Sequence, residues 1–483
     1  MKSIITTYKS VLNKNCLLSS SLHHEVDINN SNILLLKDLL ERELKRSDLG
    51  KEVGSINYVN GSNFFFVKTK ALQDYSFLPI FNSESTETVS PQSFQNQNLK
   101  KGDVILSKDS NIGEVIILDD DYPNYMLSGA LYKLPLKETY KYYALAMIKH
   151  KYFREQLDKI VPKGATIRHA GTKFLDCMIP FPNNNCESIV SYITQLTKKV
   201  IDIEVEIKNK YKIISSIIEE ELIKNSTCEN SYKYPTYNCL MNLKRLDTGV
   251  YSKSFLYIDG LIKNYNNGYF FISADKLKSG NTPKVRQFDT FKNGDVRWVT
   301  PTNCSDYGYI ENYESIKTTS KCNLTEDSSL FINRTSRGGK GEYVGISTFY
   351  DYKSYGNGYH NQGIYRVTGY SKDILIFITC FLNIPIMRKY CSGLSVGSKM
   401  KEIKSEQFLS IPIPKFNNQK LTDVVNLFYS GETSFSLKTL KNLDVKKTGL
   451  FQLDTARKAL KSHINNIIDL IINDVPFDPE KEL

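Results

Sequence analysis

The most regular hydrophobic pattern in the sequence lies between residues 187 and 225. Apolar side chains recur there in alternating steps of four and three, which is the spacing of a coiled-coil seam. The stretch contains neither proline nor glycine, and about 36 helical residues would span roughly 54 Å. We therefore predict a long spacer helix. Its seam residues, which we expect to contact a partner, are Ile193, Leu196, Val200, Ile203, Ile207 and Ile214.

The segments on either side of this helix follow one another in the same order. Each half has a short apolar strand, a polar turn with basic residues, and a second strand. A glycine-containing turn follows some fifty residues later, and then an Ile-Pro-x-Pro sequence, which begins at Ile179 in one half and at Ile411 in the other. A repeat of about 230 residues indicates a duplicated domain and excludes a solenoid of short units.

The pattern divides the chain into five parts. We predict a first domain at residues 1–186, the spacer helix at 187–225, a second domain at 226–417, distal helices at 418–474 and a tail at 475–483. Both domains are expected to be α+β, since strand-like runs and amphipathic helical stretches alternate in them.

Several elements can be predicted inside these parts. We expect helices at residues 31–46, 140–157 and 374–390, strands at 63–67 and 104–106, and distal helices at 421–429 and 455–472. The last helix carries an apolar stripe that suits packing on the spacer helix. Its residues include Leu460, Ile464 and Ile467.

Composition narrows the class of protein. The net charge of +11 suits a polyanionic partner, although a lysine-rich proteome would explain it equally well. The nine cysteines form no CxxC pair and the six histidines have no ligand spacing, so we predict reduced thiols and no structural metal. No apolar run is long enough to span a bilayer and no secretion signal is visible, so we expect a cytoplasmic protein.

A basic, glycine-rich stretch at residues 334–341 is the strongest candidate for binding nucleic acid. It places three cations and three glycines in eight residues, and arginine can bond a guanine edge bidentately. The spacing of a phosphate-binding P-loop is absent. The turns at residues 164–168 and 397–401 suit either DNA contact or a plain structural connection.

Motifs of catalysis are missing from the sequence. It contains no Asn/Asp-Pro-Pro-Tyr or Phe-x-Gly-x-Gly pattern of an adenine methyltransferase, no Walker motif, and no nuclease cluster of the PD…ExK type. This pattern favours a recognition module over an enzyme, with no catalytic residue in the chain.

Several blocks of sequence resemble one known family. In the second half these are SGNTP (residues 279–283), GDVRWVTP (294–301), TSRG (335–338) and the segment from Ser395 to Pro414. In the first half they are GDVILS (102–107) and the segment from Gly164 to Pro182, whereas SGNTP and WVTP have no counterpart there. Together these blocks resemble the specificity (S) subunits of type I restriction-modification enzymes.

The resemblance implies a fold and a function. It implies two tandem target recognition domains in a pseudo-twofold repeat, separated and followed by long coiled-coil spacer helices, which read a bipartite double-stranded DNA target. It implies methyltransferase subunits, two of them, and a restriction subunit as partners. S-adenosylmethionine and ATP with Mg²⁺ would be bound by those partners and not by this chain. The residues that we expect to contact DNA are Lys108, Asn111, Lys163, Thr166, Arg168, Arg297, Arg334, Thr335, Arg337, Lys340, Ser398 and Lys399.

Two alternatives remain open at this point. The chain could serve a phage-defence methylation system that has no restriction subunit. It could instead be a coiled-coil scaffold whose duplicated domains bind protein, including a decoy that blocks a modification enzyme.

Overall fold

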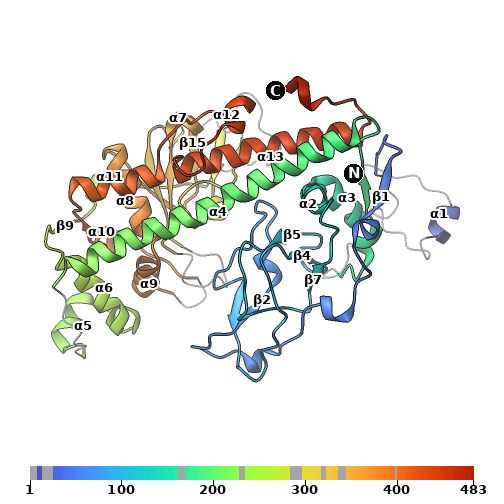
Figure 1. Ribbon diagram of the computed structural model, residues 1–483. Coiled ribbons are helices and arrows are strands. Elements are labelled where there is room, and N and C mark those ends of the chain that lie inside the picture. Colours follow the sequence, from blue (N-terminus) through green and yellow to red (C-terminus); the bar gives the residue numbers. More distant parts are fainter. Residues whose placement is uncertain are drawn as a thin grey trace. The chain divides into compact units, whose positions relative to one another are not determined.

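The computed structural model describes residues 8–13, 26–161, 169–227, 234–282, 296–316, 322–334, 344–397 and 400–482 (Figure 1). The chain forms two compact units. Unit 1 comprises Met1–Val205, Phe435–Leu443 and Ala456–Leu483, and unit 2 comprises Glu206–Ser434 and Asp444–Thr455. The chain passes from one unit to the other within the helices α4 (Cys186–Lys224) and α13 (Leu450–Ile472), and also after Ser434 and after Leu443.

The strands described in unit 1 form three small sheets. β1 pairs with β8 antiparallel, β2 lies between antiparallel β3 and parallel β6, and β4 lies between antiparallel β5 and β7. The strands are β1 (Ile33–Leu35), β2 (Phe65–Val67), β3 (Thr86–Thr88), β4 (Val104–Ser107), β5 (Val115–Ile117), β6 (Tyr125–Leu127), β7 (Leu131–Leu134) and β8 (Met178–Pro180). Fully buried Ile105 and Leu131 belong to one hydrophobic cluster between the second and third sheets.

One predicted helix of unit 1 is divided in the structure. The expected single helix at 140–157 is two helices, α2 (Lys141–Lys149) and α3 (Lys151–Ile160). His150 separates them because its backbone is extended, with φ −70° and ψ 146°, and its side chain accepts a hydrogen bond from the Tyr152 amide. The unit also contains α1 (Tyr8–Asn13) and α12 (Leu437–Lys441).

The helix predicted at residues 31–46 is wrong. Residues Ile33–Leu35 are a strand instead, paired with the Ile-Pro segment of β8, and two short 3-10 helices, Leu36–Leu39 and Arg46–Asp48, follow. Pairing with a distant strand overrides the local helical pattern, and Leu36 and Leu39 of the following 3-10 helix are completely buried.

Unit 2 also contains small sheets and surrounding helices. β13 lies between β16 and β14, with β10 at the edge beside β16; β11 lies between antiparallel β12 and parallel β15; and β9 pairs with β17. The strands are β9 (Tyr269–Phe270), β10 (Leu277–Ser279), β11 (Val296–Val299), β12 (Glu314–Ile316), β13 (Ser328–Ile332), β14 (Ser347–Tyr350), β15 (Gly358–His360), β16 (Ile364–Val367) and β17 (Ile413–Pro414). The helices are α5 (Tyr237–Leu243), α6 (Lys253–Lys263), α7 (Tyr352–Tyr355), α8 (Lys372–Asn383), α9 (Pro385–Leu394), α10 (Ser405–Leu409) and α11 (Asn418–Phe428).

The helix expected at residues 374–390 is likewise two helices. α8 ends before Ile384, whose backbone is extended, and Pro385 starts α9. Among the described residues no single helix is long and apolar enough to cross a membrane; α8 and α9 pass that test of length and composition only as a pair, bent by 77°.

The two units share one order of strand pairing. In each, a parallel pair (β2 with β6, β11 with β15) carries an additional antiparallel strand. A central strand (β4, β13) pairs with the first and third strands that follow it (β5 and β7, β14 and β16). A pair of consecutive helices follows in each unit (α2 and α3, α8 and α9). The short strand of the Ile-Pro-x-Pro segment comes after them (β8, β17). The strand pair β2–β3 of unit 1 therefore has a counterpart in unit 2, although the sequences of these segments show no common block.

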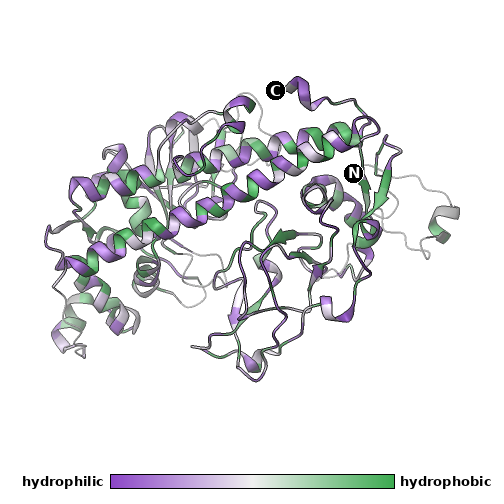
Figure 2. Ribbon diagram, in the orientation of Figure 1, coloured by the Kyte–Doolittle hydropathy of each residue, from purple (hydrophilic) through white to green (hydrophobic). Residues whose placement is uncertain are grey.

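The long helix expected at residues 187–225 is α4. The side chains of its expected seam are buried, at 0% exposed for Ile193, Val200 and Ile203, whereas hydrophilic residues occupy most of its exposed positions (Figure 2). Within unit 1, α4 and α13 run antiparallel, since Tyr192 contacts His463 and Glu204 contacts Arg457. The expected stripe on α13 is buried as well, including Leu460, Ile464 and Ile467.

Candidate nucleic-acid interface

The loop after β4 joins three segments at one end of the third sheet of unit 1. The amide of Lys108 donates to the carbonyl of Ala130, 2.9 Å away, and the carbonyl of Lys108 accepts from the amide of Ala170, also at 2.9 Å. The loop is thereby fixed between the β6–β7 turn and the segment that precedes β8. Lys108 and Asn111 are two of the residues predicted to contact DNA, and both lie here.

The charged side chains of this loop have internal partners. The Lys108 ammonium pairs with the Asp109 carboxylate, whose other oxygen lies 2.8 Å from Nδ1 of His169. Asn111 Nδ2 donates to the carbonyl of Leu72 at 3.4 Å. His169 is 66% exposed, and sequence reasoning missed it. The sequence feature that could have pointed to His169 is its position directly after the turn at residues 164–168.

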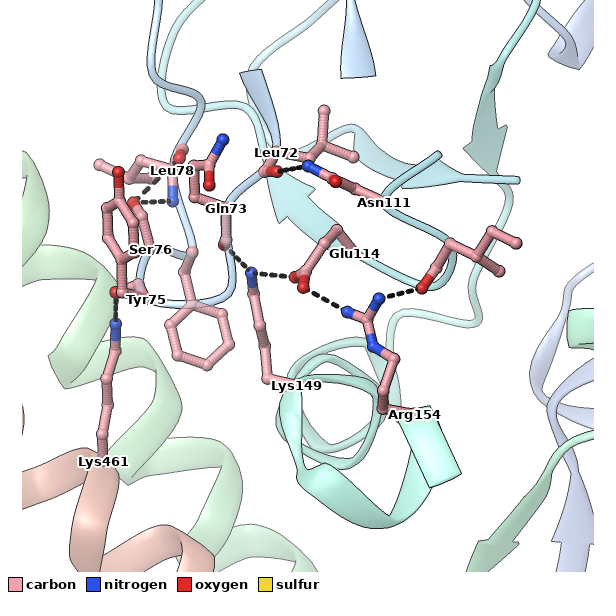
Figure 3. Close-up of polar contacts among 12 residues, drawn as sticks. Leu72, Gln73, Tyr75, Ser76, Leu78, Asn111, Glu114, Lys149, Arg154 and Lys461 are labelled. Carbon is pink, nitrogen blue, oxygen red and sulfur yellow. Dashed lines mark hydrogen bonds and ion pairs between the residues drawn. The ribbon is translucent and has the colours of Figure 1, made fainter. Parts of the chain in front are cut away.

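A network of ion pairs connects the loop to helices α2 and α3 (Figure 3). Glu114 at the end of the loop pairs with Lys149 of α2 at 3.3 Å and with Arg154 of α3, and Arg154 also donates to the carbonyl of Ile112. Burial lowers the pKa of Lys149, and the negative charge of Glu114 opposes that effect. The helix pair therefore sets the conformation of the loop. We expect a loop supported in this way to present a fixed shape to a ligand.

Gly113 lies in the same loop and permits close packing. Its φ is +80°, and a Cβ there would lie 2.4 Å from Cδ1 of Leu157 on α3. In unit 2, Gly345 has φ +102°, and its Cβ would lie 2.6 Å from Cβ of Cys391 on α9. Each unit thus needs a glycine where this loop meets the second helix of the pair.

A second segment reaches the same end of the sheets in unit 1. The amide of Gly50 donates to the carbonyl of Leu131, and the amide of Lys51 donates to the carbonyl of Leu127, both at 2.9 Å. A Cβ on Gly50 would lie 2.0 Å from the carbonyl oxygen of Ser128, so only glycine fits.

Unit 2 repeats this junction atom for atom in its backbone. The amide of Gly280 donates to Ile364 at 3.3 Å, and that of Asn281 donates to His360 at 3.2 Å. A Cβ on Gly280 would lie 2.0 Å from the carbonyl oxygen of Asn361. Gly280 belongs to the SGNTP block, so Gly50 occupies its position in the first half. Sequence comparison missed the match because the two segments have only the glycine in common.

The loop after β13 matches the loop after β4 in the same way. The amide of Asn333 donates to the carbonyl of Gly363 at 3.0 Å, and its carbonyl accepts from Ile403 at 2.7 Å. Asn333 therefore corresponds to Lys108, and Arg334 to Asp109. Arg334 is half-buried and its backbone is bridged to Glu402.

Arg297, predicted to contact DNA, has contacts within unit 2. Its Nη1 donates to the carbonyl of Tyr355 at 2.5 Å, and its guanidinium carbon lies 4.7 Å from the centre of the Tyr313 ring. The remaining residues predicted to contact DNA lie outside the described residues. They are Lys163, Thr166, Arg168, Thr335, Arg337, Lys340, Ser398 and Lys399.

The described part of the site consists of loops and the backbone frame that holds them. Within the described ranges no three His, Cys, Asp or Glu side chains are grouped so that they could hold a metal ion. What the geometry provides is a set of loops on a rigid backbone frame, which is the arrangement of a binding surface.

Comparison with known proteins agrees with this picture. Residues 50–212 match the family model of the type I restriction modification DNA specificity domain. The matched range begins at Gly50, at the junction described above, and ends within α4. No curated protein sequence matches the chain.

Solved structures of the same class are similar over nearly the whole chain. An S subunit of a type I restriction-modification system from M. genitalium has 13% identity and a TM-score of 0.38, covering 95% of this chain and 100% of the other. An HsdS subunit from Thermoanaerobacter tengcongensis has 11% identity and a TM-score of 0.27, covering 92% and 97%. The match of residues 50–212 to the specificity-domain family model confirms, for this part of the chain, the resemblance seen in the sequence.

Proposed function

We propose that the whole chain is a non-catalytic DNA sequence-recognition subunit that directs a partner adenine methyltransferase, together with a restriction subunit, to a bipartite target. The observation that carries this proposal is the junction around Gly50 and its repetition around Gly280. A family model matches the first of these junctions. An equivalent frame in unit 2 supports a second domain of the same kind.

Each unit would read one half of the target. The loops that each frame holds differ in sequence, with Lys108 and Asp109 in unit 1 where unit 2 has Asn333 and Arg334. Base recognition depends on the side chains and not on the frame, so the two half-sites should differ. A pseudo-twofold relation of the units is part of this proposal.

The spacer helices would set the length of the gap between the half-sites. α4 has 39 residues, about 58 Å at 1.5 Å per residue. That length is roughly one and three-quarter turns of B-DNA at about 34 Å per turn. The buried seam residues hold α4 and α13 in place, and the exposed faces of these helices would form the attachment surface for methyltransferase subunits, two of them in this proposal. S-adenosylmethionine, ATP and Mg²⁺ would be bound by the partners.

Two other functions make different predictions. A methylation system without a restriction subunit would leave DNA recognition unchanged and would differ only in the genes beside this one. A protein-binding scaffold or decoy would associate with its partner in a way that is insensitive to salt and independent of DNA. The charge of +11 favours DNA, because neutralised phosphates release counterions.

Selection of DNA by the purified complex tests the proposal. The full chain, isolated with the partner that copurifies with it, would be incubated with a pool of random duplexes, and the retained duplexes sequenced. A two-part asymmetric motif with a fixed gap is the expected result. Retention without any motif, or no retention at low salt, would contradict a recognition function.

A further inference from the structure

Unit 1 has an exposed surface that the residues discussed so far do not include. It is formed by two loops, residues 54–63 before β2 and residues 89–98 after β3. We name it the amide patch, after its exposed side chains Asn60, Asn63, Gln92, Gln95 and Asn96. The side chains of Asn60, Asn63, Gln92 and Gln95 form no hydrogen bond within the described part of the chain.

The two loops of the amide patch are fixed to one another. The Val89 amide donates to the Phe64 carbonyl at 3.0 Å, and the Ser90 amide donates to the Asn57 carbonyl at 2.9 Å. The rings of Phe64 and Phe94 stack with their centres 4.3 Å apart. Asn63 and Gln95 directly adjoin these two rings in sequence, so their backbones are held in place.

The charge and apolar content of the patch point to its ligand. Residues 52–67 and 85–99 contain no lysine or arginine, so these loops lack the cations that bind phosphate. They do carry an exposed apolar side chain, Ile56, which is 91% exposed, and Val59 at 37%. Exposed amide side chains beside an exposed aliphatic side chain can bind a ligand that presents both hydrogen-bonding groups and a methyl group.

We propose that the amide patch reads A·T base pairs in the major groove. Asparagine and glutamine pair bidentately with N6 and N7 of adenine, and an apolar side chain contacts the methyl group of thymine. The inference rests on the proposed function and deepens it: the half-site read by unit 1 contains at least one A·T pair recognised by Gln92 or Gln95, with Ile56 against a thymine methyl.

The unit 1 frame supports this placement. Gln97, in the second of the two loops, accepts a hydrogen bond from the Leu127 amide at 2.6 Å, and Leu127 is the residue that accepts from Lys51 at the Gly50 junction. In unit 2 the side chain of Asn323 accepts from the His360 amide at 2.8 Å in the same way. The patch is thereby tied to the junction that is repeated in both units.

Methylome sequencing of variants in the native host tests the inference. The double variant Gln92→Ala/Gln95→Ala and the single variant Ile56→Ser would be compared with the wild type. Glu155→Gln, an exposed position on α3, is the control. We expect the double variant to lose about tenfold or more of its discrimination at an A·T position in one half of the motif. The other half of the motif, and the whole motif of the control, should stay unchanged.

Each other outcome separates this inference from the function that it rests on. If the wild-type gene produces no two-part motif, the proposed function fails. If it does and the variants methylate the same motif with the same strictness, the amide patch is not a reading surface. A uniform loss of methylation at all sites, with the motif kept, would also overturn the inference, because it would assign these side chains to folding, backbone contact or a protein partner.

Discussion

The carboxylate of Glu204 on α4 accepts a hydrogen bond from the backbone amide of Phe77, 2.8 Å away, in the loop between β2 and β3. Lys461 of α13 lies 2.6 Å from the same carboxyl group, and Arg457 lies 3.4 Å from it. The side chain of Glu204 is 5% exposed. One buried carboxylate therefore connects the sheets of unit 1 to both helices that pass through this unit.

Replacing this carboxylate should destabilise unit 1. Glu204→Gln removes the carboxylate charge that Lys461 and Arg457 contact, and breaking a buried ion pair costs about 3–5 kcal/mol. Urea unfolding would measure the loss, with Glu220→Gln, exposed on the same helix, as the control. A variant as stable as the control would show that this contact does not hold the helices to the sheets.

The pH dependence of the same group has a defined sign. Burial alone would raise the pKa of Glu204, but Lys461 and Arg457 hold it below its ordinary value. A lowered carboxyl pKa contributes stability above the unfolded pKa, and that stability is lost as the pH falls through the folded value. Wild-type protein should therefore lose more stability on acidification than Glu204→Gln. Parallel curves for the two proteins would contradict this.

His360 should add a second acid-sensitive contribution, in unit 2. Burial, with the charge of Arg366, lowers its pKa to about 4. Because the folded pKa is depressed, the stability is fully present above the unfolded value and falls as the pH drops from about 6.5 to 4, by about 3 kcal/mol in all. His360→Gln should flatten the unfolding free energy between pH 7 and pH 4.5, whatever its effect at pH 7. An unchanged slope would exclude His360 as the titrating group.

Gly50 and Gly280 should be equally intolerant of a side chain. Alanine at either position would place Cβ 2.0 Å from a carbonyl oxygen, an overpacking that typically costs about 1–3 kcal/mol. Thermal unfolding would measure it. Gly54→Ala is the matched control, because nothing lies within 4 Å of its Cβ position. If either alanine variant has the same melting temperature as the Gly54→Ala control, the junction in that unit is not rigid.

The seam of α4 gives a prediction about assembly. Val200 and Ile203 are completely buried, so replacing both with aspartate places two charges in an apolar interface. We expect loss of the helix pairing and of copurification with a methyltransferase partner. Gel filtration of the coexpressed proteins would measure it. A double variant that stays folded and bound to its partner would refute the role assigned to this seam.

The sequence was most informative where periodicity was long. The repeat of α4 predicts the helix, its ends to within one residue, and its buried face. The bent helix pairs were less predictable, since His150 and Ile384 interrupt apolar patterns that continue on both sides. Residues 33–35 form a strand because β1 pairs with the distant strand β8. A local sequence pattern cannot show such a long-range pairing.

The candidate site was only partly accessible from sequence. Blocks such as SGNTP pointed to unit 2, but the match of Gly50 with Gly280 emerged from hydrogen bonds to turns 80 residues or so away. Basic and polar residues of the loops drew attention in the sequence, yet Lys108, Asn111 and Arg297 have internal partners. The amide patch contains no charged side chain that would have marked it in the sequence, and its two loops are brought together by the β2–β3 pairing and by the contacts beside it, such as the stacking of Phe64 on Phe94.

Long-read mapping of modified adenines in the native genome, with this gene intact and deleted, tests the central claim most directly. Our account predicts that deletion abolishes methylation at one two-part asymmetric motif and leaves other motifs unchanged. An identical methylome in both strains would contradict the assignment of the chain as the sequence-recognition subunit of an active methyltransferase.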